Sequence, residues 1–170
     1  QNSNKRIISE KYALFIDSNA PYHSDNMSKD SKYVNPEKYF ESQNRFIDLM
    51  ESHYRVKIVI AGSPKSRYGS EKFNNREFYR SLTPELTKHC EYMIVPYSSS
   101  SISYAVLNVK PIIFTYSDES LNAWPSMVEE MEGIASFLNI DVFNSDKILN
   151  GNEVIIQSPD IEQYNLYKYN

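Results

Sequence analysis

Residues 91–116, EYMIVPYSSSSISYAVLNVKPIIFTY, decide the fold of this chain. Two short apolar runs, at residues 92–95 and 112–114, lie on either side of a serine cluster and an amphipathic segment. This order is typical of a strand, a helix and a second parallel strand, with a polar loop after the first strand. In open α/β sheets, ligands bind at the carboxyl ends of the strands. The stretch therefore predicts both a parallel sheet and the position of a binding site.

The flanking sequence continues the alternation of strands and helices. Apolar runs predict further buried strands at residues 12–16, 56–61 and 141–143. Helices are expected at residues 35–54, 83–89, 101–107, 125–138 and 160–169, and an extended segment at residues 153–156. This order predicts an α/β fold: an open, mostly parallel Rossmann-like sheet with helices on both faces.

The length of 170 residues and the hydrophobic content of 41% are those of one ordinary domain with a real core. The chain begins with Gln1 rather than Met, and a strand follows soon after, so we expect residues 1–170 to be one domain of a longer, two-domain protein. No apolar run approaches the ~20 residues of a membrane span, so none is expected.

Charge and cysteine content exclude several classes of protein. The net charge of −4 predicts no broad basic face and disfavours nucleic-acid binding. A single thiol, Cys90, cannot form an internal disulfide, which indicates a reduced, cytoplasmic protein, and Cys90 itself is expected to be structural rather than nucleophilic. The three histidines and one cysteine form no zinc pattern, and neither a dinucleotide-binding glycine motif nor a Walker loop is present, so we expect no metal and no cofactor.

The serine cluster is the first candidate site. Ser98, Ser99, Ser100 and Ser101 would place hydroxyl donors beside the free amide groups at the start of a helix, a setting suited to a phosphate or a carboxylate. The alternative is that one serine caps the helix and the others are solvated.

Three further residues lie in loops after predicted strands. Lys65 follows the second strand and could neutralise a diphosphate, or it could be a solvated loop lysine. His23, in the long polar loop at residues 17–35, could donate to a phosphate or act as an acid, and could equally have no role. Asp17 directly follows the first strand and could contact a ligand or cap the turn.

Two motifs together resemble a known family. Residues 97–101 (YSSSS), the short apolar helix after them and residues 110–114 (KPIIF) resemble the donor-binding half of GT-B-fold transferases that build bacterial surface polymers. The similarity is greatest to CDP-glycerol glycerophosphotransferases and capsular-polysaccharide glycosyltransferases, and it covers about residues 10–140. The resemblance implies that this chain is the carboxyl-terminal, nucleotide-binding half of such an enzyme.

The resemblance also implies roles for particular residues. Tyr97 and the four serines after it would contact the donor phosphates, and Asp118 and Glu119 would lie against a sugar or ribose hydroxyl. Where relatives often have His-Pro-Lys after the second strand, this chain has Ser63-Pro64-Lys65, so a histidine-based role at that turn does not carry over.

The leading hypothesis is a glycosyltransferase domain that binds a nucleotide-sugar of the CMP, CDP or UDP type. Through the missing amino-terminal half it would pass the sugar to a polysaccharide acceptor at the inner face of the membrane. No catalytic residue is assigned within this chain. The base that deprotonates the acceptor would lie outside it, so the isolated domain is expected to be inactive. The alternatives are a non-catalytic ligand-binding or interaction module and a sugar-nucleotide epimerase domain.

Overall fold

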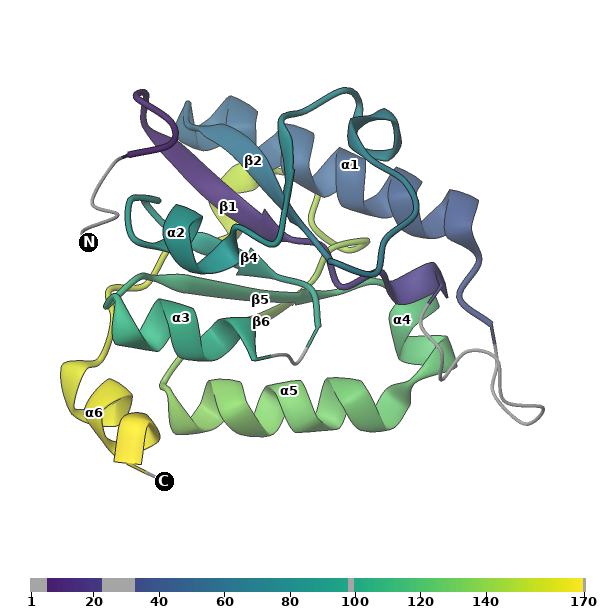
Figure 1. Cartoon of the computed structure of the whole chain (residues 1–170). Coiled ribbons are helices and arrows are strands. Elements are labelled where there is room, and N and C mark those ends of the chain that lie inside the picture. The colour runs from purple at the N-terminus through teal and green to yellow at the C-terminus, as the bar shows by residue number, and fades with distance from the viewer. Residues whose placement is uncertain (1–5, 23–32, 98–99, 170) are drawn as a thin grey trace.

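The computed structural model describes residues 6–22, 33–97 and 100–169, and they form one open α/β sheet (Figure 1). Its six strands are β1 (Tyr12–Ile16), β2 (Lys57–Gly62), β3 (Phe78–Arg80), β4 (Met93–Val95), β5 (Ile112–Tyr116) and β6 (Val142–Asn144). The strand order is β3-β2-β1-β4-β5-β6, and every neighbouring pair is parallel. The predicted Rossmann-like α/β fold is therefore confirmed.

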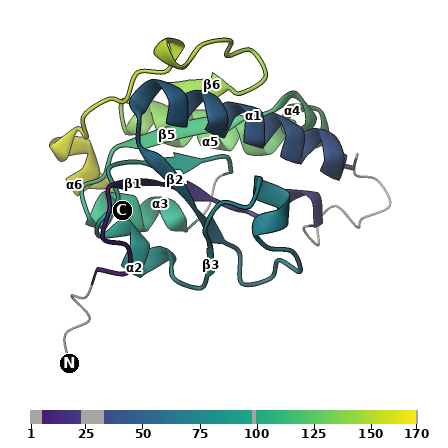
Figure 2. The ribbon, with the colours of Figure 1, turned by 90° about the horizontal axis from the view of Figure 1, so that it is seen from above.

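Helices cover both faces of the sheet (Figures 1 and 2). The α-helices are α1 (Pro36–Tyr54), α2 (Thr83–Thr87), α3 (Ser101–Leu107), α4 (Asp118–Ala123), α5 (Pro125–Phe137) and α6 (Ile161–Tyr169), and the 3-10 helices are η1 (Ala20–Tyr22), η3 (Ser70–Phe73) and η4 (Gly151–Glu153). Along β1, Ala13 and Phe15 pack with α1, whereas Leu14 and Ile16 pack with α2, α3 and α5. This alternation follows from the two-residue period of a strand that is buried on both faces.

The longest helix, α1, begins and ends with local signals that the sequence carries. The side chain of Asn35 accepts a hydrogen bond from the Lys38 amide at 3.1 Å, and Pro36 is the first helical residue. At the other end, Arg55 adopts a left-handed conformation, and its amide donates to the carbonyl of Glu51. These ends fix the position of α1 above the strands.

Several described segments differ from the sequence-based prediction. The edge strand β3, the helix α4 and the 3-10 helix η3, in which Phe73 is fully buried, were not predicted. Residue 153, expected to begin an extended segment, instead ends η4, which is closed by a capping box between Asn150 and Glu153.

The described turns use left-handed residues other than glycine. Positive φ angles occur at Asn19, Arg55, Asn74, Asn75, Ser81, Val109 and Asn139, and at none of the four glycines. Asparagine tolerates this region better than most residues because its short side chain can bond to the local backbone.

Two of the glycines differ in how much space a side chain would have, and substituting them gives a matched pair of variants. A Cβ at Gly151 would lie 2.4 Å from the His53 Cβ and 2.8 Å from the Leu49 carbonyl oxygen, whereas a Cβ at Gly133 would meet nothing within 4 Å. We expect Gly151→Ala to lower the free energy of unfolding by about 1–3 kcal/mol because α1 and η4 must move apart. Gly133→Ala, within α5, should raise it by about 0.5–1 kcal/mol. Urea unfolding followed by circular dichroism tests both, and equal midpoints for the two variants would contradict this packing.

Candidate functional site

The strand order changes direction between β1 and β4. From β1 the chain proceeds outward through β2 to β3, and from β4 it proceeds in the opposite direction through β5 to β6. The loops after β1 and β4 therefore diverge, which leaves a crevice at the carboxyl ends of these strands. A pocket of about 450 Å³ occupies this crevice, and we call it the switch-point pocket.

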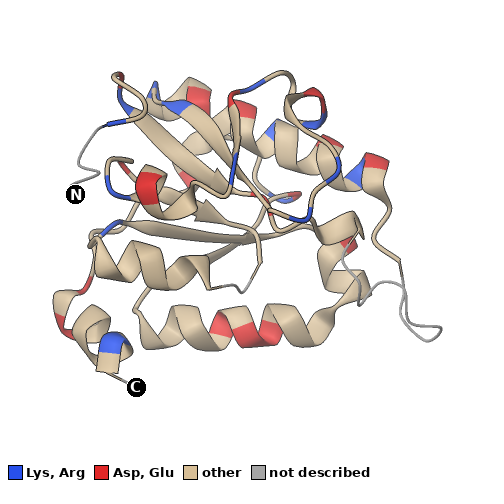
Figure 3. Ribbon diagram, viewed as in Figure 1, with Lys and Arg blue, Asp and Glu red and all other residues tan. Residues whose placement is uncertain are grey.

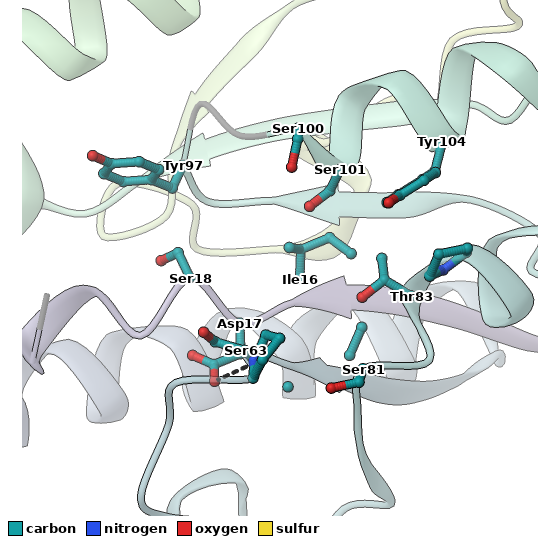
Figure 4. A pocket seen from close by; sticks show the side chains of 14 residues that line it. Ile16, Asp17, Ser18, Ser63, Ser81, Thr83, Tyr97, Ser100, Ser101 and Tyr104 are labelled. Atoms are coloured by element: carbon teal, nitrogen blue, oxygen red, sulfur yellow. Dashed lines mark hydrogen bonds between the residues drawn. The ribbon is translucent and has the colours of Figure 1, made fainter.

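The switch-point pocket is lined by the ends of β1 and β2, the turns after β2 and β3, the start of α2, Tyr97 after β4, and α3 with the residue before it (Figure 4). Its hydroxyl-bearing side chains are Ser18, Ser63, Ser81, Thr83, Tyr97, Ser100, Ser101 and Tyr104. Asp17 is the one charged residue among the described residues that line it. Helix α3, which forms one wall, has no charged residue (Figure 3). The pocket is thus rich in groups that both donate and accept hydrogen bonds.

Asp17 lies at the end of β1 with only 3% of its surface exposed. Its Oδ1 accepts hydrogen bonds from the Tyr68 hydroxyl at 2.8 Å and from the Asn19 amide at 3.0 Å. Its Oδ2 accepts one longer bond, 3.4 Å, from the amide of Ser63 (Figure 4). These bonds fix the carboxyl group at the wall of the pocket between β1 and β2.

Burial raises the pKa of Asp17 above its usual range, because the charged form loses its water. The hydrogen bonds from Asn19, Tyr68 and Ser63 act in the opposite direction, as does the more distant charge of Arg80. Burial also raises the pKa of Tyr68, and the neighbouring Asp17 raises it further. Tyr68 is therefore a neutral donor to Asp17 at physiological pH.

The ring of Tyr68 packs against other aromatic rings that do not line the pocket. Its ring centroid lies 5.1 Å from that of Phe40, 6.4 Å from that of Phe73 and 6.3 Å from that of Phe78. The guanidinium of Arg80 also donates to the carbonyl of Tyr68. The position of Asp17 thus depends on a packed cluster that lies outside the pocket.

The structure brings together four of the residues that the sequence singled out. Ser63 lines the pocket from the turn after β2, and Tyr97, Ser100 and Ser101 line it from the opposite side (Figure 4). Ser100 directly precedes α3, yet its side chain makes no capping hydrogen bond to the described residues after it. The interpretation of this serine as a plain helix cap is therefore not supported, and its hydroxyl faces the pocket. Ser98, Ser99 and His23 lie outside the described residues.

Three other predicted residues lie apart from the lining of this pocket. Lys65 is exposed, and its amide donates to the Ser63 hydroxyl at 3.2 Å. Asp118 accepts from Asn144 at 2.7 Å, and this bond is the main cause of the lowered pKa of Asp118.

Glu119 accepts a hydrogen bond from the Asn35 amide at 3.2 Å and lies 3.5 Å from the ammonium group of Lys38. Glu119, the second residue of α4, therefore joins that helix to the start of α1. The ligand contacts expected of Lys65, Asp118 and Glu119 stay predictions.

Sequence reasoning did not select several lining residues. Ser18, Ser81, Thr83 and Tyr104 were not predicted to line a ligand site, and for Asp17 the sequence left open a ligand contact or a turn cap. The signal was present for Asp17, since a carboxyl directly after a buried strand lies at the ligand-binding edge of a parallel sheet. No such signal marks Ser81 in the sequence, because the strand before it, β3, was not predicted.

Cys90 lies outside this site. It is buried, its thiol donates to the carbonyl of Thr87 at 3.4 Å, and burial raises its pKa to about 12. Such a thiol is protonated at neutral pH and is a poor nucleophile, which agrees with a structural role.

Two features are not found in the part of the chain that the structure describes. These residues contain no cluster of His, Cys, Asp and Glu side chains that could hold a metal ion. None of their helices is long and apolar enough to cross a bilayer. Comparison of the chain with models of protein families gave no match, and a search of curated proteins found no similar sequence.

Proposed function

We propose that this chain is the donor-binding domain of a glycosyltransferase that takes a nucleotide-sugar and transfers the sugar to a bacterial surface polysaccharide. The observation that carries the proposal is the switch-point pocket. It lies where Rossmann-like sheets bind nucleotides, and Tyr97, Ser100 and Ser101, which follow β4, line it.

The arrangement supports a specific division of roles. Ser100 and Ser101 lie at the amino-terminal end of α3 and offer hydroxyl groups to the departing phosphate. An acceptor hydroxyl attacks the anomeric carbon, the bond from that carbon to the phosphate oxygen breaks, and the nucleotide (a diphosphate from a CDP or UDP donor, CMP from a CMP donor) leaves with the electron pair. Residues outside this domain supply the base that removes the acceptor proton.

Calorimetric titration of the purified chain with CMP, CDP and UDP tests the proposal. We expect binding of at least one of them, and we expect Ser100→Ala and Ser101→Ala each to weaken it by about threefold to tenfold, the effect of one lost hydrogen bond. Ser136→Ala, on the exposed surface of α5, is the matched control and should leave binding unchanged. No binding of any of the three at millimolar concentration would favour a non-catalytic module instead.

A further inference from the structure

The hydrogen bonds that Asp17 makes within the chain do not by themselves explain why a carboxyl group is buried at this position. It is almost fully buried, yet among the described residues no Lys or Arg side chain forms an ion pair with it. Buried carboxyl groups are rare unless they are paired, because removing them from water is costly. A group that the fold retains at this cost, at the wall of a pocket, is a candidate for contact with a ligand.

The two oxygens of Asp17 are unequally used. Oδ1 receives two bonds of ordinary length, from Tyr68 and Asn19, whereas among the described residues the one donor to Oδ2 is the Ser63 amide, at 3.4 Å. A carboxylate oxygen can accept about two hydrogen bonds, so Oδ2 has acceptor capacity left. Asp17 lines the pocket, so a ligand that enters it can supply a further donor to Oδ2.

The chemistry of the pocket decides which kind of group this is. An anionic phosphate against Asp17 would be repelled or would force the carboxyl to take up a proton, since no Lys or Arg is among the described lining residues. A ligand hydroxyl instead donates to the carboxylate and favours its charged form. The hydroxyl groups of Ser63, Ser81 and Thr83, which line the same side of the pocket, can each donate to or accept from further ligand hydroxyls.

We propose that Asp17 Oδ2 accepts hydrogen bonds from an uncharged, polyhydroxylated part of the ligand, either the ribose or the transferred sugar. The phosphates then lie across the pocket, beside Ser100 and Ser101, which face Asp17 and Ser63 from the other wall (Figure 4). This inference rests on the proposed function for the identity of the ligand, but its chemistry depends only on the pocket.

The test compares wild type with Asp17→Asn, which keeps the shape and removes the charge. The probes are CDP and UDP, their 2′,3′-dideoxy analogues, and UDP-glucose, each titrated by calorimetry. Loss of a charge-assisted hydrogen bond should weaken binding of the hydroxylated probes by about tenfold to a hundredfold. If the ribose is bound, CDP and UDP lose affinity and the dideoxy analogues do not. If the sugar is bound, only UDP-glucose loses affinity.

The opposite sign would overturn the proposal. If a phosphate lay against Asp17, removing the negative charge would strengthen the binding of every diphosphate probe. Unchanged affinity for all probes would overturn it as well. Asp141→Asn is the matched control, because Asp141 is exposed and directly precedes β6. It should leave the affinity for every probe unchanged.

Two additions keep the result interpretable. The dideoxy and sugar-bearing probes change the ligand rather than the protein, so their affinities for wild type test the contact even if Asp17→Asn unfolds. If wild type binds no nucleotide, the proposed function fails, and the pocket is then titrated with ribose, glucose and glycerol by nuclear magnetic resonance. Shifts at Ser18 and Ser63 that Asp17→Asn abolishes would support the inference alone, and no shift with any polyol would overturn it.

Discussion

Replacing Phe73 with alanine is expected to lower the free energy of unfolding by about 3–5 kcal/mol, the range typical of a fully buried aromatic ring. Phe73 is 0% exposed. Its ring centroid lies 5.8 Å from that of Phe15, 5.4 Å from that of Phe40 and 5.9 Å from that of Phe78. The cavity left by the ring would be surrounded by residues of β1, α1 and β3, which cannot all move inward. Chemical denaturation followed by near-ultraviolet circular dichroism measures the loss.

The matched control is Phe137→Ala, because the ring of Phe137 on α5 is 41% exposed. That variant should lose less than about 1 kcal/mol, since little apolar area leaves the core. Phe73→Ala should also weaken ligand binding, because Phe73 supports Tyr68, and Tyr68 bonds to Asp17. Similar stabilities for the two variants would show that the aromatic cluster is not the packed unit described here.

Replacing Arg76 with alanine is expected to lower the free energy of unfolding by about 2 kcal/mol. The guanidinium group donates to Glu51 at 2.9 Å and 3.2 Å, to the Asn44 side chain at 3.2 Å and to the Phe73 carbonyl at 3.3 Å, and it also pairs with Asp48. The Arg76 side chain is 10% exposed, whereas those of Glu51 and Asp48 are 30% and 60% exposed. Loss of a fully buried partner costs about 3–5 kcal/mol, and the solvent around these carboxylates reduces that figure.

Arg67→Ala is the control for Arg76→Ala, because Arg67 lies on an exposed part of the same loop. It should change the unfolding free energy by less than about 0.5 kcal/mol. Arg76→Lys should keep one ion pair and lose the remaining bonds of the planar group, so its stability should fall between wild type and Arg76→Ala. A loss for Arg76→Ala no larger than that for Arg67→Ala would contradict a role for Arg76 in holding the loop before β3 against α1.

The central part of the fold could be predicted from the sequence, because five of the six strands contain short apolar runs, and Asn35-Pro36 and Thr83-Pro84 mark the starts of α1 and α2. The edge strand β3 could not, since only three residues form it and they are half-exposed, so no periodic pattern marks them. Its position depends on its pairing with β2. A pairing between distant segments leaves no local signal in the sequence.

The candidate site was predictable to the extent that it lies on strand ends. Ser100 and Ser101 were predicted because they follow β4 closely, and Asp17 was a candidate because it directly follows β1. The sequence could not show that Lys65 is not among the residues that line the pocket or that Glu119 pairs with Lys38, because both depend on how loops and helix ends pack. Local composition suggests charge at a site, but the packing decides which charges reach it.

The left-handed turns bear on how the chain behaves before it folds. An asparagine in such a turn has fewer accessible backbone states in the denatured ensemble than a glycine would have, so less entropy is lost when the turn forms. The cost is a less favourable dihedral angle in the native state at each such position, and most of all at Val109, whose branched side chain suits this region least. The backbone of these turns is thus partly restricted before the chain folds. This restriction favours short connections, which align the ends of neighbouring strands at a common edge of the sheet.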